Sequence, residues 1–349
     1  MIPVLKVITP GFHTTIQDEG RRGFQHVGVP VSGALDRNGF MLANALAGNA
    51  QNAACLEIIG SGPELEVVGA SVRLALVGSG GGLEISGREN PIVCSGQTTR
   101  LTKGEIVRVR LGGDVFCSYL AIEGGFDVPP CLKSRSTYTR AGFGGLSGRK
   151  LQSSDVLHGS IDDVAAHDEV MLGEQRDLRF DRPIRVVLGP QDNYFTEDAI
   201  REFLSGIYTI TPASDRMGFR LAGPVLAHKS DYNIVSDGIV AGSIQVPGSK
   251  LPIVLMADAQ TTGGYPKIAT VISADLPRLG VRGAGRTVKF QAVSREEAEA
   301  IHRAEHQEIL NITQGIKPLS ETHGINLKAL YTCNLIDGVV DAKADDFKY

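Results

Sequence analysis

The sequence predicts a mainly β protein built from closed β-barrels or β-sandwiches. Short segments rich in β-branched residues recur along the 349 residues, for example LEIIG (56–60), VRLALVG (72–78) and EIVRVRLG (105–112). Glycine contributes 42 residues, well above the usual share of ~7%, and marks frequent turns. Because few helical stretches separate these segments, barrels or sandwiches explain the spacing better than a sheet with alternating helices.

An internal repeat predicts two related units. The pattern DRxGFxLA occurs at residues 36–43 and again at 215–222. Farther along, GPELEV (62–67) falls near GSIQV (242–246), and VRLALVG falls near PIVLMAD (252–258). One eight-residue match can arise by chance, but the ordered matches around it favour a diverged tandem duplication.

The length and the helix signals divide the chain further. A chain of 349 residues exceeds the ~250–300 at which a single core usually stops growing. Short helices are expected at 37–47 and 197–204, and a longer one starts at the capping box of Ser294 and Glu297 and continues to Ile312. The predicted units are 1–183, 184–293, and a C-terminal helix and tail at 294–349, with a polar, acidic tip at 341–349.

Composition excludes several classes of partner. Thirty-five basic and 39 acidic side chains give a net charge of −4, too small and mixed to indicate nucleic acid or an anionic membrane. No segment approaches the ~18 apolar residues of a membrane helix, and no charged leader followed by a long apolar run opens the chain. The five cysteines are scattered, without a CxxC pair, which is typical of reduced cytosolic thiols. We therefore expect a cytoplasmic protein.

The segment ADAQTTGGYPKIATVI (257–272) is the most informative candidate site. It places hydrogen-bonding side chains in a turn between two apolar, strand-like segments, PIVLM (252–256) and IATVI (268–272). Gly263 and Gly264 allow a ligand or a second backbone to approach closely. An ordinary hairpin loop is the alternative, because Gly, Thr and Asp are common in such loops.

Arginine-containing loops form the next candidates. In SRSTYTR (134–140), Arg135 and Arg140 can clamp a carboxylate, although a surface loop held by salt bridges explains the sequence equally well. The two DR pairs of the repeat are expected to be internal ion pairs that fix their loops. These structural residues are Asp36, Arg37, Asp215 and Arg216.

Two motif matches carry little weight. HRAEH (302–306) fits the HxxEH zinc pattern, but it lies on a polar helix without an evident third ligand, so a solvated helix face is favoured. GSGGG (78–82) lacks the Lys-Ser/Thr ending of a P-loop and is better explained as a turn. No metal site is expected.

Five segments taken together resemble one family. It is the family of the C subunit of 5-oxoprolinase, the KipI antagonist KipA and allophanate hydrolase subunit 2, related to the carboxyltransferase domain of urea carboxylase. The resemblance covers roughly residues 3–293. The segments are TTIQDEGRRGFQHVGVPVSGALDR (14–37), LEIIGSGPELE (56–66), SRSTYTRAGFGG (134–145), SDRMGFRL (214–221) and GSIQVPGSKLPIVLMADAQTTGGYPKIATVI (242–272).

This resemblance implies a fold and a set of functions. The fold is a tandem pair of cyclophilin-like β-barrels, with a few short helices. The implied function is that of a subunit, inactive without its partners, of a heteromeric enzyme. That enzyme opens a lactam with ATP, as 5-oxoprolinase does, or transfers a carboxyl group from biotin to a urea-like amide. The alternative is a regulatory module that antagonises a KipI-like kinase inhibitor.

The resemblance also implies partners and a source of cofactors. The partners are a KipI-like protein, the B subunit of 5-oxoprolinase, and either a LamB/YcsF-like protein, its A subunit, or a biotin carboxylase. The sequence has no P-loop and no Met-Lys-Met biotin-attachment sequence. ATP or carboxybiotin is therefore expected to act through partner subunits, with no cofactor bound covalently by this chain.

Carried over by position, the resemblance implies the site residues. Lys267 and the threonine hydroxyls suit the stabilisation of negative charge on an amide oxygen, and Asp258 suits the handling of a proton. Ala259 stands where some relatives carry Arg. The members of the family therefore need not all bind the same anionic group. Asp258 and Lys267 are the expected catalytic residues. The expected substrate-binding residues are Gln260, Thr261, Thr262, Gly263, Gly264, Tyr265, Arg135 and Arg140.

Overall fold

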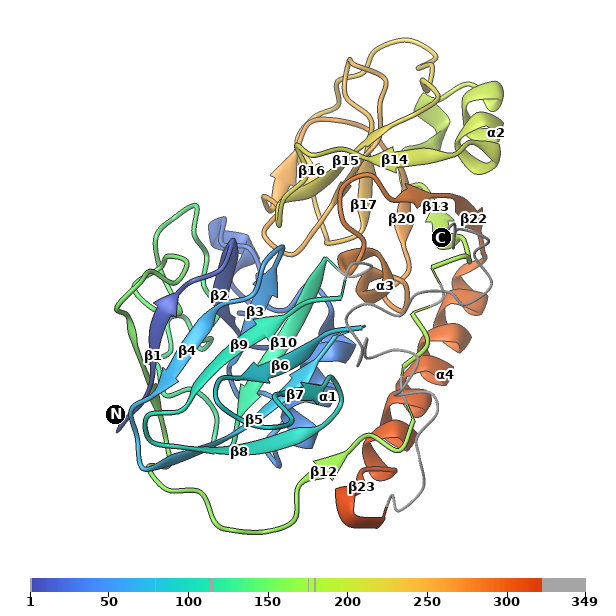
Figure 1. Ribbon diagram of the computed structural model, residues 1–349. Helices are drawn as coiled ribbons and strands as arrows, with labels where there is room; N and C mark the ends of the chain where they lie inside the picture. Colours follow the sequence, from blue (N-terminus) through green and yellow to red (C-terminus); the bar gives the residue numbers. More distant parts are fainter. Residues whose placement is uncertain (1, 79, 113–115, 175, 179, 322–349) are drawn as a thin grey trace, which may run out of the picture.

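The computed structural model describes residues 2–78, 80–112, 116–174, 176–178 and 180–321. Two β-rich units lie one above the other, and helix α4 (Arg295–Gln314) runs along one side of both (Figure 1). The mainly β fold class is confirmed, including a nearly closed barrel.

The first unit contains two antiparallel sheets that enclose one apolar core. The strand orders are β11–β1–β4–β9–β6–β7 and β2–β3–β10–β5–β8. Alternate residues point inward, as in β4, where Leu65 and Val67 are buried between half-buried glutamates. The bounds are β1 Ile2–Thr9, β2 His13–Gln17, β3 Cys55–Ile59, β4 Glu64–Val67, β5 Ser71–Val77, β6 Gly82–Ile85, β7 Ile92–Cys94, β8 Thr98–Thr102, β9 Ile106–Arg110, β10 Cys117–Ile122 and β11 Val156–Gly159.

Helix α1 (Arg37–Leu46) covers the outer face of the second of these sheets. Asp36 caps the helix by accepting a hydrogen bond from the Gly39 N–H at 3.1 Å. Phe40, Leu42 and Leu46 are buried, and the helix contacts β3, β5 and β10. The sheet is therefore buried on both faces in this region, consistent with the fully buried strand β10.

The second unit is built on one eight-stranded sheet. Its order is β21–β14–β15–β18–β17–β20–β13–β22, antiparallel except for the β13–β22 pair. Helices α2 (Glu197–Ser205) and α3 (Leu276–Gly280) accompany it, and β16 (Asp237–Gly238) pairs separately with β19 (Thr262–Gly263). The sheet strands are β13 Ile184–Leu188, β14 Tyr208–Ile210, β15 Gly218–Ala222, β17 Ser243–Gln245, β18 Ile253–Leu255, β20 Lys267–Val271, β21 Thr287–Val288 and β22 Phe290–Ala292.

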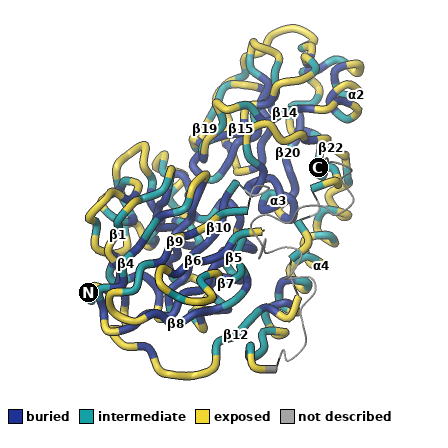
Figure 2. Tube along the Cα trace, in the orientation of Figure 1, coloured by how far each residue is buried: buried dark blue, intermediate teal, exposed yellow. Residues whose placement is uncertain are grey.

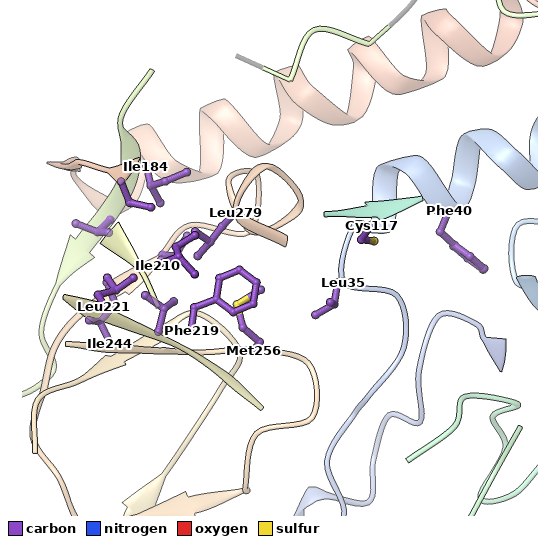
Figure 3. Packing of buried hydrophobic residues seen from close by; sticks show 14 of the residues in the cluster. Leu35, Phe40, Cys117, Ile184, Ile210, Phe219, Leu221, Ile244, Met256 and Leu279 are labelled. Atoms are coloured by element: carbon purple, nitrogen blue, oxygen red, sulfur yellow. The ribbon is translucent and has the colours of Figure 1, made fainter. Parts of the chain in front are cut away.

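A single apolar cluster joins the two units. It begins at Phe40 on α1, includes Leu35 and Cys117, and continues through Met256 to Phe219 in the second unit (Figure 3). Figure 2 shows that the segments of both units are buried where the units meet. Because burial of apolar area is the main stabilising contribution to folding, the two units are expected to unfold together.

The chain returns to the first unit after the second. Helix α4 starts at the predicted capping box, in which Ser294 and Glu297 each accept the other's backbone N–H. It packs against α1 and β13, and β23 (Lys317–Pro318) then pairs with β12 (Val170–Met171). The linker between the units is thus held by the segment that follows α4.

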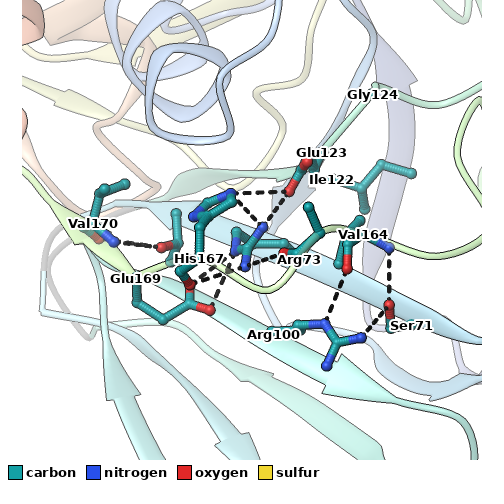
Figure 4. A network of polar contacts seen from close by, with 12 residues as sticks. Ser71, Arg73, Arg100, Ile122, Glu123, Gly124, Val164, His167, Glu169 and Val170 are labelled. Atoms are coloured by element: carbon teal, nitrogen blue, oxygen red, sulfur yellow. Dashed lines mark hydrogen bonds and ion pairs between the residues drawn. The ribbon is translucent and has the colours of Figure 1, made fainter. Parts of the chain in front are cut away.

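Arg73 anchors this linker to the first unit. Its buried guanidinium binds Glu123 on one side, Glu169 at 3.2 Å on the other, and the Ala165 carbonyl at 3.0 Å (Figure 4). Glu169 and Ala165 belong to the linker, whereas Glu123 directly follows β10. One side chain therefore ties three segments together.

The predicted helices are confirmed, but the repeat as aligned from the sequence is wrong. Its first copy forms α1 and its second copy forms β15. GPELEV and VRLALVG are β4 and β5, which belong to different sheets, whereas GSIQV and PIVLMAD contain the paired strands β17 and β18. The pattern fits both periods, because its Phe and Ala are three residues apart, as on one side of a helix, while its Phe and Leu are two residues apart, as on one face of a strand.

Other expectations have mixed outcomes. Cys55, Cys117 and Cys131 are free thiols, but Cys94, partly exposed on β7, is disulfide-bonded, so the expectation of reduced cysteines is wrong there. Cys333 and the acidic tip at 341–349 lie outside the described residues. Within the described ranges, no helix is both long and apolar enough to cross a membrane.

We predict that Arg73→Met lowers the free energy of unfolding by about 2–3 kcal/mol, because it leaves two glutamates and linker carbonyls without their partner. This is somewhat below the ~3–5 kcal/mol for a fully buried pair, since Glu123 and Glu169 are 22% and 23% exposed. The matched control is Arg108→Met, whose side chain is 50% exposed and pairs with Glu64, and it should cost less than about 1 kcal/mol. Urea unfolding of both variants tests this, and equal effects would contradict it.

Candidate functional site

The predicted QTTGGYP loop lies at one edge of the second unit. It follows β18, and Thr262 and Gly263 pair with Gly238 and Asp237 through the β16–β19 ladder. The Ile239 N–H donates to the Thr261 carbonyl at 2.9 Å. Gln260, Thr262 and Tyr265 are exposed, so these side chains can meet a ligand or another protein. Gly263 is packed so closely that a Cβ there would meet Gln245 and Ile239.

Lys267 is buried beneath this loop in a defined polar contact. Its Nζ donates to Asp237 Oδ2 at 2.7 Å and to the Gly238 carbonyl at 3.3 Å. The hydrogen bond from Lys267 holds the pKa of Asp237 below its usual range. Gln191 supports the arrangement, because its amide donates to the same carboxylate and its Oε1 accepts the Lys267 N–H. The ammonium group is therefore fixed in position.

Asp258 lies in a different cluster, at the junction of the units. Both of its carboxylate oxygens accept from Arg216, at 2.8 Å from Nε and 3.1 Å from Nη2. The same guanidinium binds Glu57 of β3 and the Gly33 carbonyl at 2.7 Å. Arg216 thus links the second unit to two segments of the first.

The carboxylates determine the electrostatics of this junction. Burial alone lowers the pKa of Arg216, but Asp258 and Glu57 outweigh it and raise the pKa above the ordinary value. Glu57 is completely buried and also accepts from the Tyr119 hydroxyl at 2.6 Å and the Leu35 N–H at 2.8 Å. Both buried carboxylates are thus paired with donors, so the cluster serves as a cross-link between the units.

Asp258 and Lys267 are not brought together. Lys267 pairs with Gln245, and Gln245 pairs with Ile253, so Lys267 is level with the start of β18, whereas Asp258 follows its end. No hydrogen bond or ion pair joins them within the described residues. Their assignment as catalytic residues stays a prediction, and each is bound by its own partner, Asp237 for Lys267 and Arg216 for Asp258.

Arg135 and Arg140 also separate. Arg135 donates its backbone N–H to Asp18 Oδ2 at 2.5 Å and its Nε to the Val128 carbonyl at 3.0 Å, so it fixes its own loop. Arg140 is exposed and contacts the sulfur of Met217, next to Arg216. Of the two arginines, Arg140 is the one positioned near Asp258.

The DR pairs fix their loops, but not as internal ion pairs. Asp36 binds Arg176 at 2.6 Å, and Arg37 lies 3.9 Å from Glu19. Asp215 accepts the N–H groups of Met217 and Gly218, which closes the turn before β15. Adjacent side chains at a helix start or a turn point apart. Asp36, Arg37 and Arg216 therefore have partners in other segments, whereas Asp215 binds its own turn.

Several site residues escaped the sequence analysis. Glu57, Asp18 and Arg176 each bind a distant segment, and for Glu57 the available signal was a single carboxylate within the apolar strand LEIIG. His13 also faces the junction; burial, assisted by Arg216, lowers its pKa, and its Nδ1 has no partner in the described part. Among the described residues no cluster of His, Cys, Asp or Glu could hold a metal, and the two histidines of HRAEH are exposed.

A cleft opens beside the junction. It has a volume of ≈ 540 Å³ and is lined by the loop at 18–38 of the first unit, the second unit near Met256 and Leu276, and His302 and Glu305 of α4. Small-molecule sites commonly have this size and lie between domains. The cleft is adjacent to Asp258 through Ala257, but Lys267 does not line it.

We predict that Arg216→Met lowers the free energy of unfolding by about 3–5 kcal/mol near pH 8, because it leaves two buried carboxylates without their shared cation. Unpaired burial raises a carboxyl pKa in the folded state, so the folded variant takes up protons and its deficit should shrink as pH falls from 8 to 5. Urea titrations of the variant and the original protein across this range provide the measurement. Arg220→Met, on an exposed side chain four residues away, is the control; a deficit that does not change with pH would contradict the prediction.

Comparison with known proteins agrees with the architecture. The family model described as "Carboxyltransferase domain, subdomain A and B" matches residues 27–292. The chain is 37% identical over 295 residues to the C subunit of 5-oxoprolinase from Escherichia coli (strain K12), covering 84% of this chain and 93% of that protein. The corresponding C subunit from Haemophilus influenzae is 36% identical over 307 residues, covering 87% of this chain and 94% of that protein.

The crystal structure of K. lactis urea amidolyase has a TM-score of 0.78 at 28% identity, covering 89% of this chain but 20% of that one. Because the family model matches most of this chain, the chain belongs to the carboxyltransferase-domain family that includes the C subunit of 5-oxoprolinase.

Proposed function

We propose that this chain is a subunit of a heteromeric, ATP-hydrolysing enzyme of the 5-oxoprolinase type, which opens a small lactam. One observation carries the choice. The chain is 37% identical over 295 residues to a protein named as the C subunit of 5-oxoprolinase, but 28% identical to the K. lactis urea amidolyase chain. Its sequence therefore favours the 5-oxoprolinase type over the urea-processing type.

The sequence supports dependence on partners. It contains neither a P-loop nor a biotin-attachment sequence, so ATP or carboxybiotin is supplied through other subunits. A KipI-like B subunit and a LamB/YcsF-like A subunit are the proposed partners. The exposed side chains of the QTTGGYP loop provide groups that can complete a site shared with another subunit.

The chemistry requires charge stabilisation at an amide carbonyl. When a lactam opens, negative charge develops on its oxygen, and a fixed cation or hydrogen-bond donor lowers the barrier. Lys267 supports this role, because Asp237 and the Gly238 carbonyl hold its ammonium in place under the loop. Asp258 is better suited to positioning Arg216, since both of its oxygens accept from that guanidinium.

We expect 5-oxoproline to stimulate ATP hydrolysis, with release of glutamate, when the chain is co-purified with its KipI-like and LamB/YcsF-like partners. Lys267→Ala should lower the stimulated rate by about 100-fold or more, in the range of a lost charge-stabilising donor. Lys229→Ala, at an exposed lysine of the same unit, is the matched control. Size-exclusion chromatography should show that both variants still assemble.

Other outcomes redirect the proposal. A stable complex in which 5-oxoproline causes no stimulation would overturn the lactam-opening function. Carboxylation of urea by the chain together with a biotin carboxylase would then establish the carboxyltransferase function. Regulation of a KipI-like kinase inhibitor without turnover, unchanged in Lys267→Ala, would establish the regulatory function.

A further inference from the structure

The cleft beside the junction combines an apolar wall with many polar and charged groups. Its apolar side is formed by residues from both units, including Val31, Ala34, Leu35, Met256, Leu276 and Pro277. Ser32, Asn38 and Glu305 contribute polar groups to the same cleft. A concave site between two units that offers both apolar contact area and convergent polar groups is a candidate small-molecule site.

Ser32 is held in an unusual conformation in this cleft. Its φ is 55°, in the left-handed region that residues other than glycine rarely adopt. The Ser32 N–H donates to the Ala257 carbonyl at 3.0 Å across the junction, which fixes the loop in this position. The Ser32 hydroxyl is buried and has no hydrogen-bond partner among the described residues. Such backbone strain is found preferentially at functional sites.

Glu305 faces Ser32's loop from helix α4. Asn38 Nδ2, on α1, donates to Glu305 Oε1 at 3.0 Å, which orients the carboxyl group. Burial raises the pKa of Glu305 to about 7, and the carboxylates of Asp275 and Asp36 add to this, whereas Arg176 and the hydrogen bond from Asn38 oppose it. Near neutral pH, a large fraction of the Glu305 carboxyl is therefore protonated.

A protonated carboxyl group is complementary to one edge of a lactam. In a cyclic amide the N–H and C=O point to the same side, next to each other. A carboxylic acid presents an O–H donor beside a C=O acceptor, so the two groups can form a pair of hydrogen bonds. A carboxylate lacks the donor and repels the amide oxygen.

We propose that this cleft binds a small cis-amide, such as a lactam, through paired hydrogen bonds to the carboxyl group of Glu305, with the Ser32 hydroxyl as a further partner. The inference rests on the proposed lactam-opening function, and it makes Glu305 a substrate-binding residue. Arg22 and Arg37 also line the cleft, so a carboxylate carried by the lactam has cations within the same cleft.

The charged surroundings of Glu305 are mixed. Asp36, Asp275 and Arg176 act on the pKa of Glu305. Glu305 also lines the cleft and a neighbouring pocket together with several other charged residues. These are Asp18, Glu19, Arg22, Arg37, Asp177, Arg185, Arg278, His302 and Glu308. Loss of the pH dependence in Glu305→Gln is therefore the measurement that assigns the pH response to Glu305 rather than to these neighbours.

Binding of 5-oxoproline, measured by ligand-observed NMR on the full chain and on the complex with its partners, tests the proposal. Affinity should be nearly constant below pH 6.5 and should fall about tenfold per pH unit well above pH 7, as the carboxyl loses its proton. N-methyl-5-oxoproline, which lacks the N–H, should bind at least about tenfold more weakly.

Three variants separate a binding role from a structural one. Glu305→Gln keeps both a donor and an acceptor, so binding should persist and lose its dependence on pH, whereas Glu305→Ala should lower affinity at least about tenfold. Glu299→Gln, an exposed glutamate of the same helix, is the control. If the Gln and Ala variants bind as the original protein does, or if pH has no effect on the original protein, the proposal is overturned.

The two proposals can fail separately. Stimulated ATP hydrolysis with pH-independent binding would retain the enzyme function and overturn this cleft. Conversely, pH-dependent lactam binding that is lost in Glu305→Ala, in a complex without stimulated hydrolysis, would retain the cleft and overturn the enzyme function.

Discussion

The guanidinium of Arg216 is the constraint on which the arrangement of the two units depends. It binds Asp258 within its own unit, and Glu57 and the Gly33 carbonyl in the other. An arginine suits this position because it stays charged when buried and offers five donors in a rigid plane. The apolar cluster around Met256 and Leu35 supplies contact area, but such contacts tolerate sliding, whereas the directional bonds of Arg216 define one relative position. The cleft takes its shape from that position.

The fold class and the helices were predictable because they depend on local signals. The alternation of charged and apolar residues identifies strands such as β4, and a capping box identifies the start of α4. The repeated DRxGFxLA pattern is ambiguous, because its apolar spacing satisfies a helix and a strand alike. The surroundings decide between them: one copy packs on a sheet as α1, and the other joins the ladder between β14 and β18.

The candidate site was predictable only in part. The QTTGGYP loop could be recognised as an exposed turn, and Asp258 and Lys267 as polar residues at strand ends. Their partners could not be identified, because Glu57 is 159 residues from Arg216 along the chain and Asp237 is 30 residues from Lys267. The proposed role of Glu305 was hidden for another reason. Its environment comes from Asn38, Arg176 and Asp275, and a pattern on α4 alone could not reveal them.

The return of the chain through α4 has a mechanical consequence. The units are connected once by the linker that Arg73 anchors and a second time by α4, which leaves the second unit and ends beside that same linker at β12 and β23. The two connections run between the same two places, the β13–β22 pair and the β12–β23 pair, and α4 also packs against α1, so two segments rather than one resist relative movement of the units. A ligand that enters the cleft therefore has to do so by movements of side chains and of the loop at 18–38, and a partner protein that pushed on α4 would deform the cleft without parting the units.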